Sequence, residues 1–325
     1  MIAVMGAGAF GTSLAISLSA VQDVLLVARD AAHADEMRKT GQNTRRLAGV
    51  SLPQRITCAD RLATEALTAE LTAVLLAIPT QRLRQFCAGL EAPMPSGVPL
   101  VACCKGIELG TGKRPSEVLE EHFPNAPVAT LTGPSFAADI ARGLPTALTL
   151  ACADGPLAAA LQAQLTTPNV RVYRTTDLIG AELGGALKNV IAIACGAAIG
   201  AGLGDSARAA LMTRGFAEMV RVAQALGADP VTLSGLSGFG DLVLTCSSEQ
   251  SRNYQAGLAL GRGAALPENL TIEGVATADA MCGMAAAQGL DLPITRAVSA
   301  LASGELQVSD AMDMLLSRPL KEETC

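Results

Sequence analysis

Three glycines close to the start of the sequence have the spacing of a phosphate-binding turn. Gly6, Gly8 and Gly11 follow the short apolar run 2–5 and open a segment with helical periodicity. Such glycines allow a tight turn and a close approach of the backbone to a pyrophosphate, while the N-terminus of the following helix attracts the anion. A tight turn without a ligand would use similar residues, but the strand before and the helix after favour a dinucleotide site.

Lys188 stands in a long apolar stretch that is rich in glycine and alanine. An ammonium in such surroundings is costly unless it has a partner or a chemical role. On a helix, Gly184 and Gly185 share the face of Lys188 and leave space beside it. Because each glycine weakens a helix by about 1 kcal/mol, a close ligand or a close helix contact must explain the pair. The alternative is ordinary helix packing with a lysine that extends to solvent.

The choice of lysine follows from the scarcity of histidine. The chain has only His33 and His122, and neither lies near the glycine-rich segments. Hydride transfer to a ketone leaves an alkoxide that needs a proton, and Lys188 is the available donor. The glycine turn and the lysine together predict a dehydrogenase.

Other polar residues occur where a ligand of such an enzyme would bind. Lys105 follows one strand-length run, and Gly133 and Ser135 follow the next, at the carboxyl edges where α/β folds bind ligands. Asp241 lies in a glycine-rich loop, and residues 251–253 offer a hydroxyl, a guanidinium and an amide to a phosphate. Each feature alone is more often a turn or a solvated charge, so the argument rests on their joint occurrence.

The residue that reads the adenosine ribose is expected about 20 residues after the glycines, at the end of the second strand. Arg29 and Asp30 both stand there. Arg29 would favour a 2′-phosphate and therefore NADP, whereas Asp30 would favour a ribose hydroxyl and therefore NAD. Either residue could instead be a helix cap or a solvated charge, so the sequence leaves the cofactor open.

The first half of the chain alternates between short apolar runs and helical patterns. The runs are 2–5, 24–28, 73–78, 100–103, 128–131, 147–151 and 170–173. The helical patterns are 11–20, 31–40, 83–90 and 157–165. This alternation predicts βαβ units around a mostly parallel sheet, whose strands read as continuous apolar runs because both faces are covered.

After residue 176 the pattern becomes helical throughout. Apolar residues recur at helical spacing in 179–201, 207–226, 277–288 and 293–303. The length of 325 residues also favours two domains. We therefore predict an α/β fold, with a Rossmann-like dinucleotide-binding domain over residues 1–176 and an all-helical substrate and catalytic domain over residues 177–325.

The composition indicates a small-molecule partner. The net charge is −6, aromatic residues make up 2% of the chain and tryptophan is absent. Neither the basic surface nor the stacking platforms of a nucleic-acid-binding protein are therefore expected.

The cysteines and the apolar segments bear on location. The nine cysteines include no C-x-x-C pair, and two histidines are too few to build a metal site with them. We predict no metal and the reduced thiols of a cytoplasmic protein. The N-terminus has no basic region before its apolar run, so we expect no signal peptide. The stretch 189–203 falls short of the roughly 20 apolar residues that a bilayer requires, and we predict a buried core helix.

Six motifs in order give the sequence a family resemblance. They are GAGAFGTSLA, CKGIE, LTGPSFA, GGALKNVIAI, GFGDLVLTC and QSRN. With this order and spacing, the chain resembles the bacterial NAD(P)-dependent glycerol-3-phosphate dehydrogenases over nearly its whole length. The resemblance implies reversible reduction of dihydroxyacetone phosphate to sn-glycerol 3-phosphate for phospholipid synthesis, with NADP or NAD as cofactor. It also allows a homodimer.

The resemblance implies roles for individual residues. By motif, Lys188 matches the family's proton donor and acceptor, and we expect Asp241 to orient it. The family's other substrate positions fall on Lys105, Gly133, Ser135, Asp241, Ser251, Arg252 and Asn253. Its cofactor positions fall on Ala9, Phe10, Arg29, Lys105, Ala137, Arg252 and Glu273, in addition to Gly6, Gly8 and Gly11.

Two departures and two alternatives accompany the resemblance. Residues 46–48 read Arg-Leu-Ala where the family often has Tyr-Leu-Pro, and Cys104 replaces a frequent threonine. The ammonium of Lys105 would favour a reactive thiolate at Cys104 if that thiol is accessible; the alternative is a buried cysteine that packs as a small hydrophobe. The alternative functions are a lysine-dependent hydroxyacid dehydrogenase and a nicotinamide-binding regulator without turnover.

Overall fold

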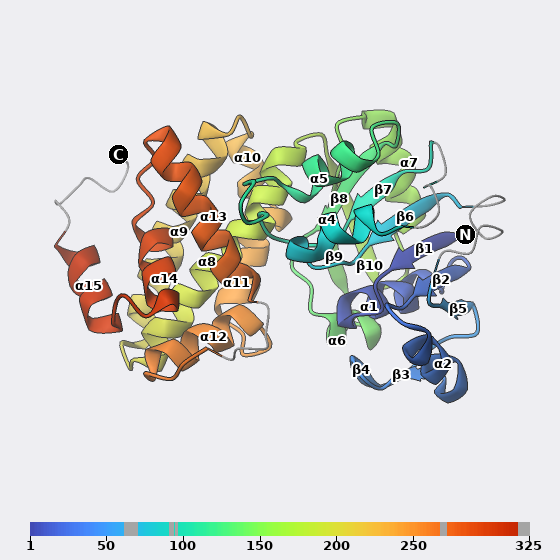
Figure 1. Ribbon diagram of the computed structural model, residues 1–325, viewed down its shortest axis with the longest axis horizontal. Coiled ribbons are helices and arrows are strands. Elements are labelled where there is room, and N and C mark those ends of the chain that lie inside the picture. The colour runs from blue at the N-terminus through green and yellow to red at the C-terminus, as the bar shows by residue number, and fades with distance from the viewer. Residues whose placement is uncertain (62–70, 91–93, 95–96, 267–271, 318–325) are drawn as a thin grey trace.

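The computed structural model describes residues 1–61, 71–90, 94, 97–266 and 272–317. An α/β part with the N-terminus and a helical part with the C-terminal helices lie side by side along the long axis (Figure 1). The predicted fold class is confirmed. The chain passes from the last strand, β10 (Val170–Thr175), directly into the long helix α8 (Leu178–Gly200). The domain boundary at residue 176 stays a prediction.

The N-terminal part is built on one eight-stranded sheet with the order β10-β9-β8-β7-β6-β1-β2-β5. Its other strands are β1 (Ile2–Met5), β2 (Val24–Val27), β5 (Ile56–Ala59), β6 (Ala73–Leu76), β7 (Leu100–Ala102), β8 (Val128–Thr132) and β9 (Thr146–Ala151). All seven predicted runs form strands, because residues of the central ones are buried on both faces. The sheet is mostly parallel as predicted, and only the β8–β9 pair is antiparallel.

Three strands were not predicted. β3 (Gln42–Asn43) and β4 (Leu47–Ser51) form a small antiparallel hairpin, and β5 closes one edge of the sheet beside β2. Each is partly exposed, so none shows the continuous apolar run of a central strand. Each of these strands forms because it pairs with a neighbouring strand, whereas its own composition is a weak signal.

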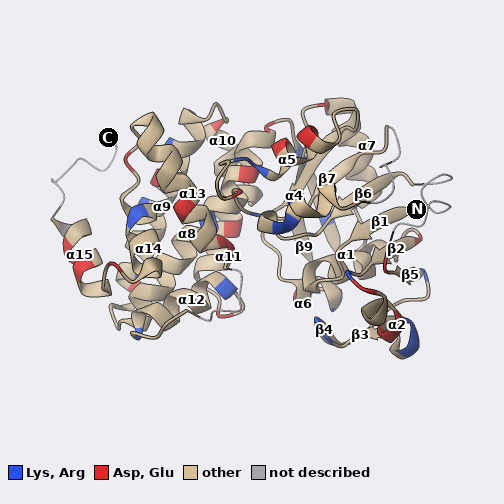
Figure 2. Ribbon diagram, viewed as in Figure 1, with Lys and Arg blue, Asp and Glu red and all other residues tan. Residues whose placement is uncertain are grey.

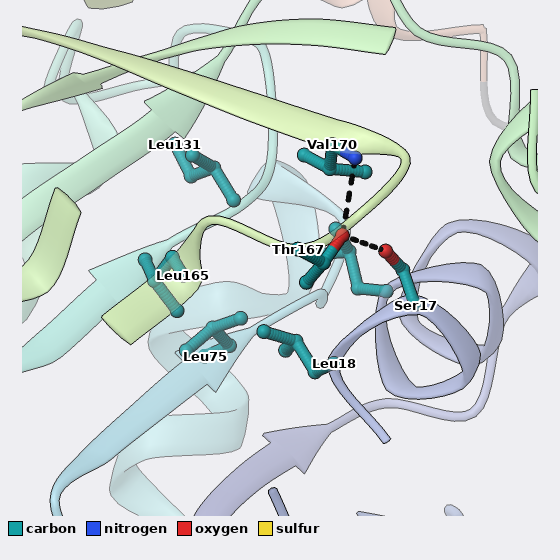
Figure 3. Close-up of a pocket in the computed structure, with 8 residues that line it drawn as sticks. Ser17, Leu18, Leu75, Leu131, Leu165, Thr167 and Val170 are labelled. Carbon is teal, nitrogen blue, oxygen red and sulfur yellow. Dashed lines mark hydrogen bonds between the residues drawn. The ribbon is translucent and has the colours of Figure 1, made fainter. Parts of the chain in front are cut away.

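Helices cover the sheet on both sides (Figure 1). Those of the N-terminal part are α1 (Ala9–Leu18), α2 (Ala31–Thr40), α4 (Thr80–Ala88), α5 (Pro115–His122), α6 (Ala137–Ala141) and α7 (Gly155–Leu165). The short helices α5 and α6 were not predicted. α1 is joined to the turn before β10, because Ser17 Oγ lies 2.6 Å from Thr167 Oγ1 beside a small gap lined by leucines (Figure 3).

The C-terminal part is helical, as predicted, and α8 runs through its centre. The other elements are α9 (Gly204–Ala225), α10 (Pro230–Leu233), the π-helical turn η1 (Leu236–Gly240), α11 (Asp241–Cys246), α12 (Arg252–Gly261), α13 (Glu273–Gln288), α14 (Pro293–Ser303) and α15 (Val308–Leu316). α12 crosses α8 very closely, since a Cβ at Gly196 or Gly257 would overlap the backbone of the other helix. The glycines of α8 therefore serve helix packing as well as the site.

α8 is also the only described helix that is long and apolar enough to cross a membrane. It has 23 residues, so the prediction from insufficient length was wrong. Of its most apolar window, however, 89% is buried inside the protein. The prediction of a buried core helix is thus confirmed, on grounds of packing.

Candidate active site

A buried ion pair joins α8 to α11. Lys188 Nζ donates to Asp241 Oδ1 at 2.5 Å and to Thr245 Oγ1 at 2.8 Å. The side chains of Lys188 and Asp241 are only 7% and 1% exposed. The carboxylate therefore offsets the cost of burying the ammonium. A lysine extending to solvent, the alternative raised by the sequence, is excluded.

A second lysine reaches the same carboxylate from the sheet. Lys105 follows β7, and its Nζ donates to Asp241 Oδ2 at 2.8 Å and to the carbonyl of Gly133 at 2.8 Å. Gly133 follows β8 directly, so both residues stand at the carboxyl edge of the sheet. The structure thus brings Lys105, Gly133, Lys188 and Asp241 together between the two parts of the molecule, as the sequence predicts.

The surroundings make Lys188 a weaker base than an ordinary lysine. Burial, with the positive charge of Lys105, lowers the pKa of Lys188 to about 8, although Asp241 acts in the opposite direction. At neutral pH its ammonium is still protonated but gives up a proton more readily than in water. This is the property that a general acid needs.

Close contacts explain the two glycines beside Lys188. A Cβ at Gly184 would lie 2.5 Å from the carbonyl oxygen of Ser237 in η1. A Cβ at Gly185 would lie 2.7 Å from Thr132 Oγ1 and 3.4 Å from Cγ of Lys105. Glycine at these positions therefore lets η1 approach α8 and lets the stem of Lys105 pass across it. The open face that the sequence indicates is filled by η1, Thr132 and Lys105.

Glu182 fixes α8 against the sheet. Its buried carboxylate accepts hydrogen bonds from Arg114 Nη1 at 2.9 Å, from Ser116 Oγ at 2.6 Å and from Thr130 Oγ1 at 3.0 Å. These donors come from the start of α5 and from β8. Burial raises the pKa of Glu182. The contact sets the position of Lys188, six residues further along the same helix.

The three N-terminal glycines differ in what surrounds them. Gly6 has φ +106°, and a Cβ there would lie 2.6 Å from the carbonyl oxygen of Ala77, while a Cβ at Gly11 would overlap the Gly6 carbonyl. A Cβ at Gly8 would meet no described atom within 4 Å. α1 begins at Ala9, and no side chain in the described part of the chain caps it. Two glycines therefore serve packing and the third faces open space, an arrangement that fits a dinucleotide.

Comparison with known proteins agrees with this geometry. Residues 1–158 match the N-terminal family model of NAD-dependent glycerol-3-phosphate dehydrogenase, and residues 177–313 match its C-terminal model. The chain belongs to this family. It is 59% identical over 325 residues to glycerol-3-phosphate dehydrogenase (NAD(P)+) of Ruegeria sp. (strain TM1040), with 99% of each chain covered.

Two further relatives support the assignment. The enzyme of the same name from Roseobacter denitrificans (strain ATCC 33942 / OCh 114) is 58% identical, again with 99% of each chain covered. The crystal structure of glycerol-3-phosphate dehydrogenase from Coxiella burnetii is 34% identical, covers 98% of each chain and has a TM-score of 0.88. The match to the family therefore covers both the N-terminal α/β part and the C-terminal helical part of the chain.

Asp30 and Arg29, the two residues that could contact the adenosine ribose, have different surroundings in the structure. Asp30 Oδ1 accepts the backbone N–H of His33 at 2.8 Å and so caps α2, as the alternative reading of the sequence proposed. The side chain of Arg29 is 92% exposed at the end of β2. Arg45, in the turn between β3 and β4, pairs with Glu36 at 2.6 Å and with Asp30 at 3.8 Å, and Figure 2 shows basic and acidic residues side by side around α2 and β4. Asp30 is therefore engaged at the helix cap, and the assignment of Arg29 to the ribose stays a prediction.

Ser251 and Asn253, in the segment 251–253, have structural roles that the sequence did not reveal. Ser251 Oγ accepts the N–H of Tyr254 and caps α12. Asn253 Nδ2 donates to Asn189 Oδ1 at 2.9 Å, and its Oδ1 accepts the N–H of Gly274 at 3.0 Å. Asn253 thus links α8, α12 and α13. No described residue accepts the hydroxyl hydrogen of Ser251 or the second amide hydrogen of Asn253, so both can serve a ligand.

Arg252 and Glu273 are neighbours at the starts of α12 and α13. Arg252 is exposed, and its charge acts on the carboxyl of Glu273. Burial nevertheless raises the pKa of Glu273 to about 7. Glu273 Oε2 is buried and has no hydrogen-bond partner among the described residues. An unpartnered buried oxygen is a natural place for a ligand donor.

The remaining predicted positions lie at the ends of strands and helices. Ser135 Oγ donates to the carbonyl of Gly133 at 3.0 Å. Ala9 and Phe10 form the first turn of α1, and Ala137 begins α6, which packs against α1. Ala9 and Phe10 thus follow the glycine turn directly, and Ala137 lies in the helix that packs against theirs.

Cys104 does not have the surroundings of a reactive thiolate. Cys104 is only partly exposed, burial raises the pKa of its thiol to about 12, and the ammonium of Lys105 is directed to Asp241 and Gly133. Cys104 packs against the apolar cluster beneath β7. The structure therefore favours the packing role over the reactive one. The eight described cysteines are all free, and Cys325 lies outside the described residues.

The sequence interpretation missed two residues of the site. Thr245 contacts Lys188 directly, and Thr132 Oγ1 is buried beside Gly185 with no partner in the described chain. The position of Thr245, four residues after Asp241 on a helix, places both on one face and could have revealed it. No sequence pattern indicated Thr132 as a site residue, because a threonine at the end of a strand is common.

Proposed function

We propose that this chain is an NAD(P)-dependent glycerol-3-phosphate dehydrogenase, which interconverts dihydroxyacetone phosphate and sn-glycerol 3-phosphate. The observation that carries the proposal is the pair of lysines on one buried carboxylate, set between the sheet edge and the helical part. Membership of the family supplies the substrate.

The chemistry assigned to the residues balances hydride transfer with proton transfer. Bound NAD(P)H supplies the hydride to the ketone carbon. Lys188 gives its proton to the carbonyl oxygen as negative charge develops there, and takes a proton from the hydroxyl in the reverse direction. Asp241 holds the ammonium of Lys188 in place, and Lys105 binds substrate oxygens beside it. Asp241 is thus a positioning residue.

Residues 251–253, Gly133 and Ser135 complete the substrate site in this proposal. Arg252 is exposed at the N-terminus of α12, where the helix dipole also favours an anion. We assign the substrate phosphate to this end. Phosphate binding away from the reacting carbon would orient the ketone toward Lys188.

Replacement of Arg252 by alanine tests the phosphate assignment. Loss of a charge-assisted hydrogen bond should raise KM for dihydroxyacetone phosphate by about 10- to 100-fold. Unphosphorylated dihydroxyacetone, measured in parallel by NADPH oxidation, should be affected much less. Equal losses on both substrates would place Arg252 at the cofactor or in the fold instead.

Replacement of Arg29 by alanine tests the reading of the ribose. Efficiency with NADPH should fall by about 10- to 100-fold, while efficiency with NADH changes little, because only NADPH carries the 2′-phosphate. Steady-state rates with each cofactor give the ratio. If the NADPH to NADH ratio stays the same, another group reads the ribose.

A substrate panel tests the proposed function against its alternatives. The purified protein is supplied with NADPH and, separately, with dihydroxyacetone phosphate, dihydroxyacetone and a 2-oxo acid. We expect efficient oxidation of NADPH with the first compound alone. Preference for the 2-oxo acid would indicate a hydroxyacid dehydrogenase, and cofactor binding without turnover would indicate a regulator.

The proposal also covers the cellular location and the metabolic role of the enzyme. We assign it to the cytoplasm and to the supply of sn-glycerol 3-phosphate for phospholipid synthesis. The free thiols of the described cysteines and membership of the family support this setting. A homodimer stays a prediction, to be measured by light scattering.

A further inference from the structure

A buried asparagine is bonded to the glycine turn. Asn43, in β3, is fully buried, and its Nδ2 donates to the carbonyl of Ala7 at 3.0 Å and to Thr12 Oγ1 at 2.7 Å. Its Oδ1 lies 2.9 Å from Nε2 of His33, which is buried in α2. All three partners are therefore in or beside the dinucleotide site described above.

The partners fix how the asparagine and the histidine are oriented. The Ala7 carbonyl can only accept, so the amide nitrogen of Asn43 must face it. The amide oxygen then faces His33, whose Nε2 must carry a hydrogen and donate. Every hydrogen of the Asn43 amide is used. The arrangement has one consistent assignment of donors and acceptors.

The bond to Ala7 controls the direction of the next backbone N–H group. In a trans peptide the C=O and the following N–H point in opposite directions. Because Asn43 holds the Ala7 carbonyl on its own side, the N–H of Gly8 is directed away from Asn43. Gly8 is the glycine of the turn that faces open space. The second bond, to Thr12, fixes the first turn of α1 relative to the Ala7–Gly8 peptide.

His33 links Asn43 to the end of the cofactor site that is assigned to the ribose. It lies in the first turn of α2, and its backbone N–H donates to Asp30 Oδ1 at 2.8 Å. Asp30 follows Arg29, the residue assigned to the ribose. The pyrophosphate turn and the ribose end are therefore joined through Asn43 and His33.

We propose that Asn43 is a positioning residue for the cofactor, which holds the Ala7–Gly8 peptide and the start of α1 in the geometry that binds the pyrophosphate. This inference rests on the proposed function, since it assumes that the chain binds NAD(P). Asn43 itself does not touch the cofactor. Its loss should weaken NADPH and NADH equally, because both carry the same pyrophosphate.

The test measures cofactor binding to the variant Asn43→Leu, which keeps the size of the side chain and removes its polar atoms without adding charge. Titration is followed by nicotinamide fluorescence, since the chain has no tryptophan to interfere. We expect Kd to rise by about 10- to 100-fold for both cofactors. At saturating cofactor, kcat should stay within about threefold of the unmodified enzyme, because Lys188 is untouched.

The chain offers a matched control in Asn169. Its Nδ2 donates to the carbonyl of Ile140 at 3.1 Å, and its Oδ1 accepts from Ser17 Oγ at 2.8 Å at the other end of α1. Asn169→Leu should lower Tm yet leave Kd for both cofactors unchanged. If Asn43→Leu does not fold, Thr12→Val removes one of its bonds and should raise Kd by about 3- to 10-fold, while Thr12→Ser retains the hydroxyl and normal binding.

The outcomes separate this inference from the proposed function. Absence of NADPH and NADH binding to the unmodified protein would contradict the proposed function. Normal binding to folded Asn43→Leu, or to Thr12→Val, would overturn the role of Asn43 alone. An equal rise of Kd in Asn169→Leu would also overturn it, because the effect would then follow from any loosening of α1.

Discussion

Replacement of Lys188 by methionine lowers kcat for dihydroxyacetone phosphate reduction by about 100-fold or more, the usual effect of losing a general acid. Methionine retains most of the length of the side chain and removes the proton. Asp241 keeps its contact with Lys105, so the carboxylate stays paired. The measurement is the steady-state rate at neutral pH with saturating NADPH.

Two controls accompany the Lys188 variant. Its Kd for NADPH and its Tm should remain close to those of the unmodified protein, because the glycine turn is not changed. Lys39→Met, at an exposed position in the last turn of α2, should retain full activity. Turnover of the Lys188 variant near the normal rate would mean that another group supplies the proton.

Replacement of Asp241 by asparagine is the second change with a large expected effect. The amide keeps the shape of the carboxylate but removes the charge that two ammonium groups share at 2.5 and 2.8 Å. Without that charge, burial and the repulsion from Lys105 should lower the pKa of Lys188 further. We expect kcat/KM for the reduction to fall by about 100-fold at neutral pH, since less of Lys188 is protonated.

The pH profile separates this explanation from simple misfolding. In the unmodified enzyme kcat/KM for reduction should decline as pH rises through about 8, where Lys188 loses its proton. In Asp241→Asn the decline should begin at lower pH, and part of the rate should return on acidification. Asp205→Asn, which changes an exposed partner of Arg208, should leave the profile unaltered. An unshifted profile in Asp241→Asn would contradict the proposed coupling.

The central strands were predictable because their neighbours cover both faces. β1 and β6 are buried along their whole length, so each is a continuous apolar run in the sequence. The edge strand β5 and the hairpin β3–β4 lack this signal. The reversed direction of β9 and β10 was not predictable either, since a buried strand has the same composition in parallel and antiparallel pairs.

The site was predictable residue by residue, but its geometry was not. Glycines beside Lys188 indicated a close contact, yet the sequence cannot say that Lys105 provides it. The shared carboxylate joins residues 136 positions apart in the chain, which no local pattern encodes. Asn43 illustrates the limit best. It is one polar residue in a polar segment, and only its burial beneath the glycine turn reveals a role.

The most direct measurement of the central claim is the stoichiometry of the reaction with the purified protein. Dihydroxyacetone phosphate and NADPH are mixed with the enzyme, and the loss of NADPH is compared with the sn-glycerol 3-phosphate that is formed. We predict equal amounts of the two, at a rate that Lys188→Met lowers by about 100-fold or more. No oxidation of NADPH or NADH that depends on dihydroxyacetone phosphate, from folded protein that binds the cofactor, would contradict the account.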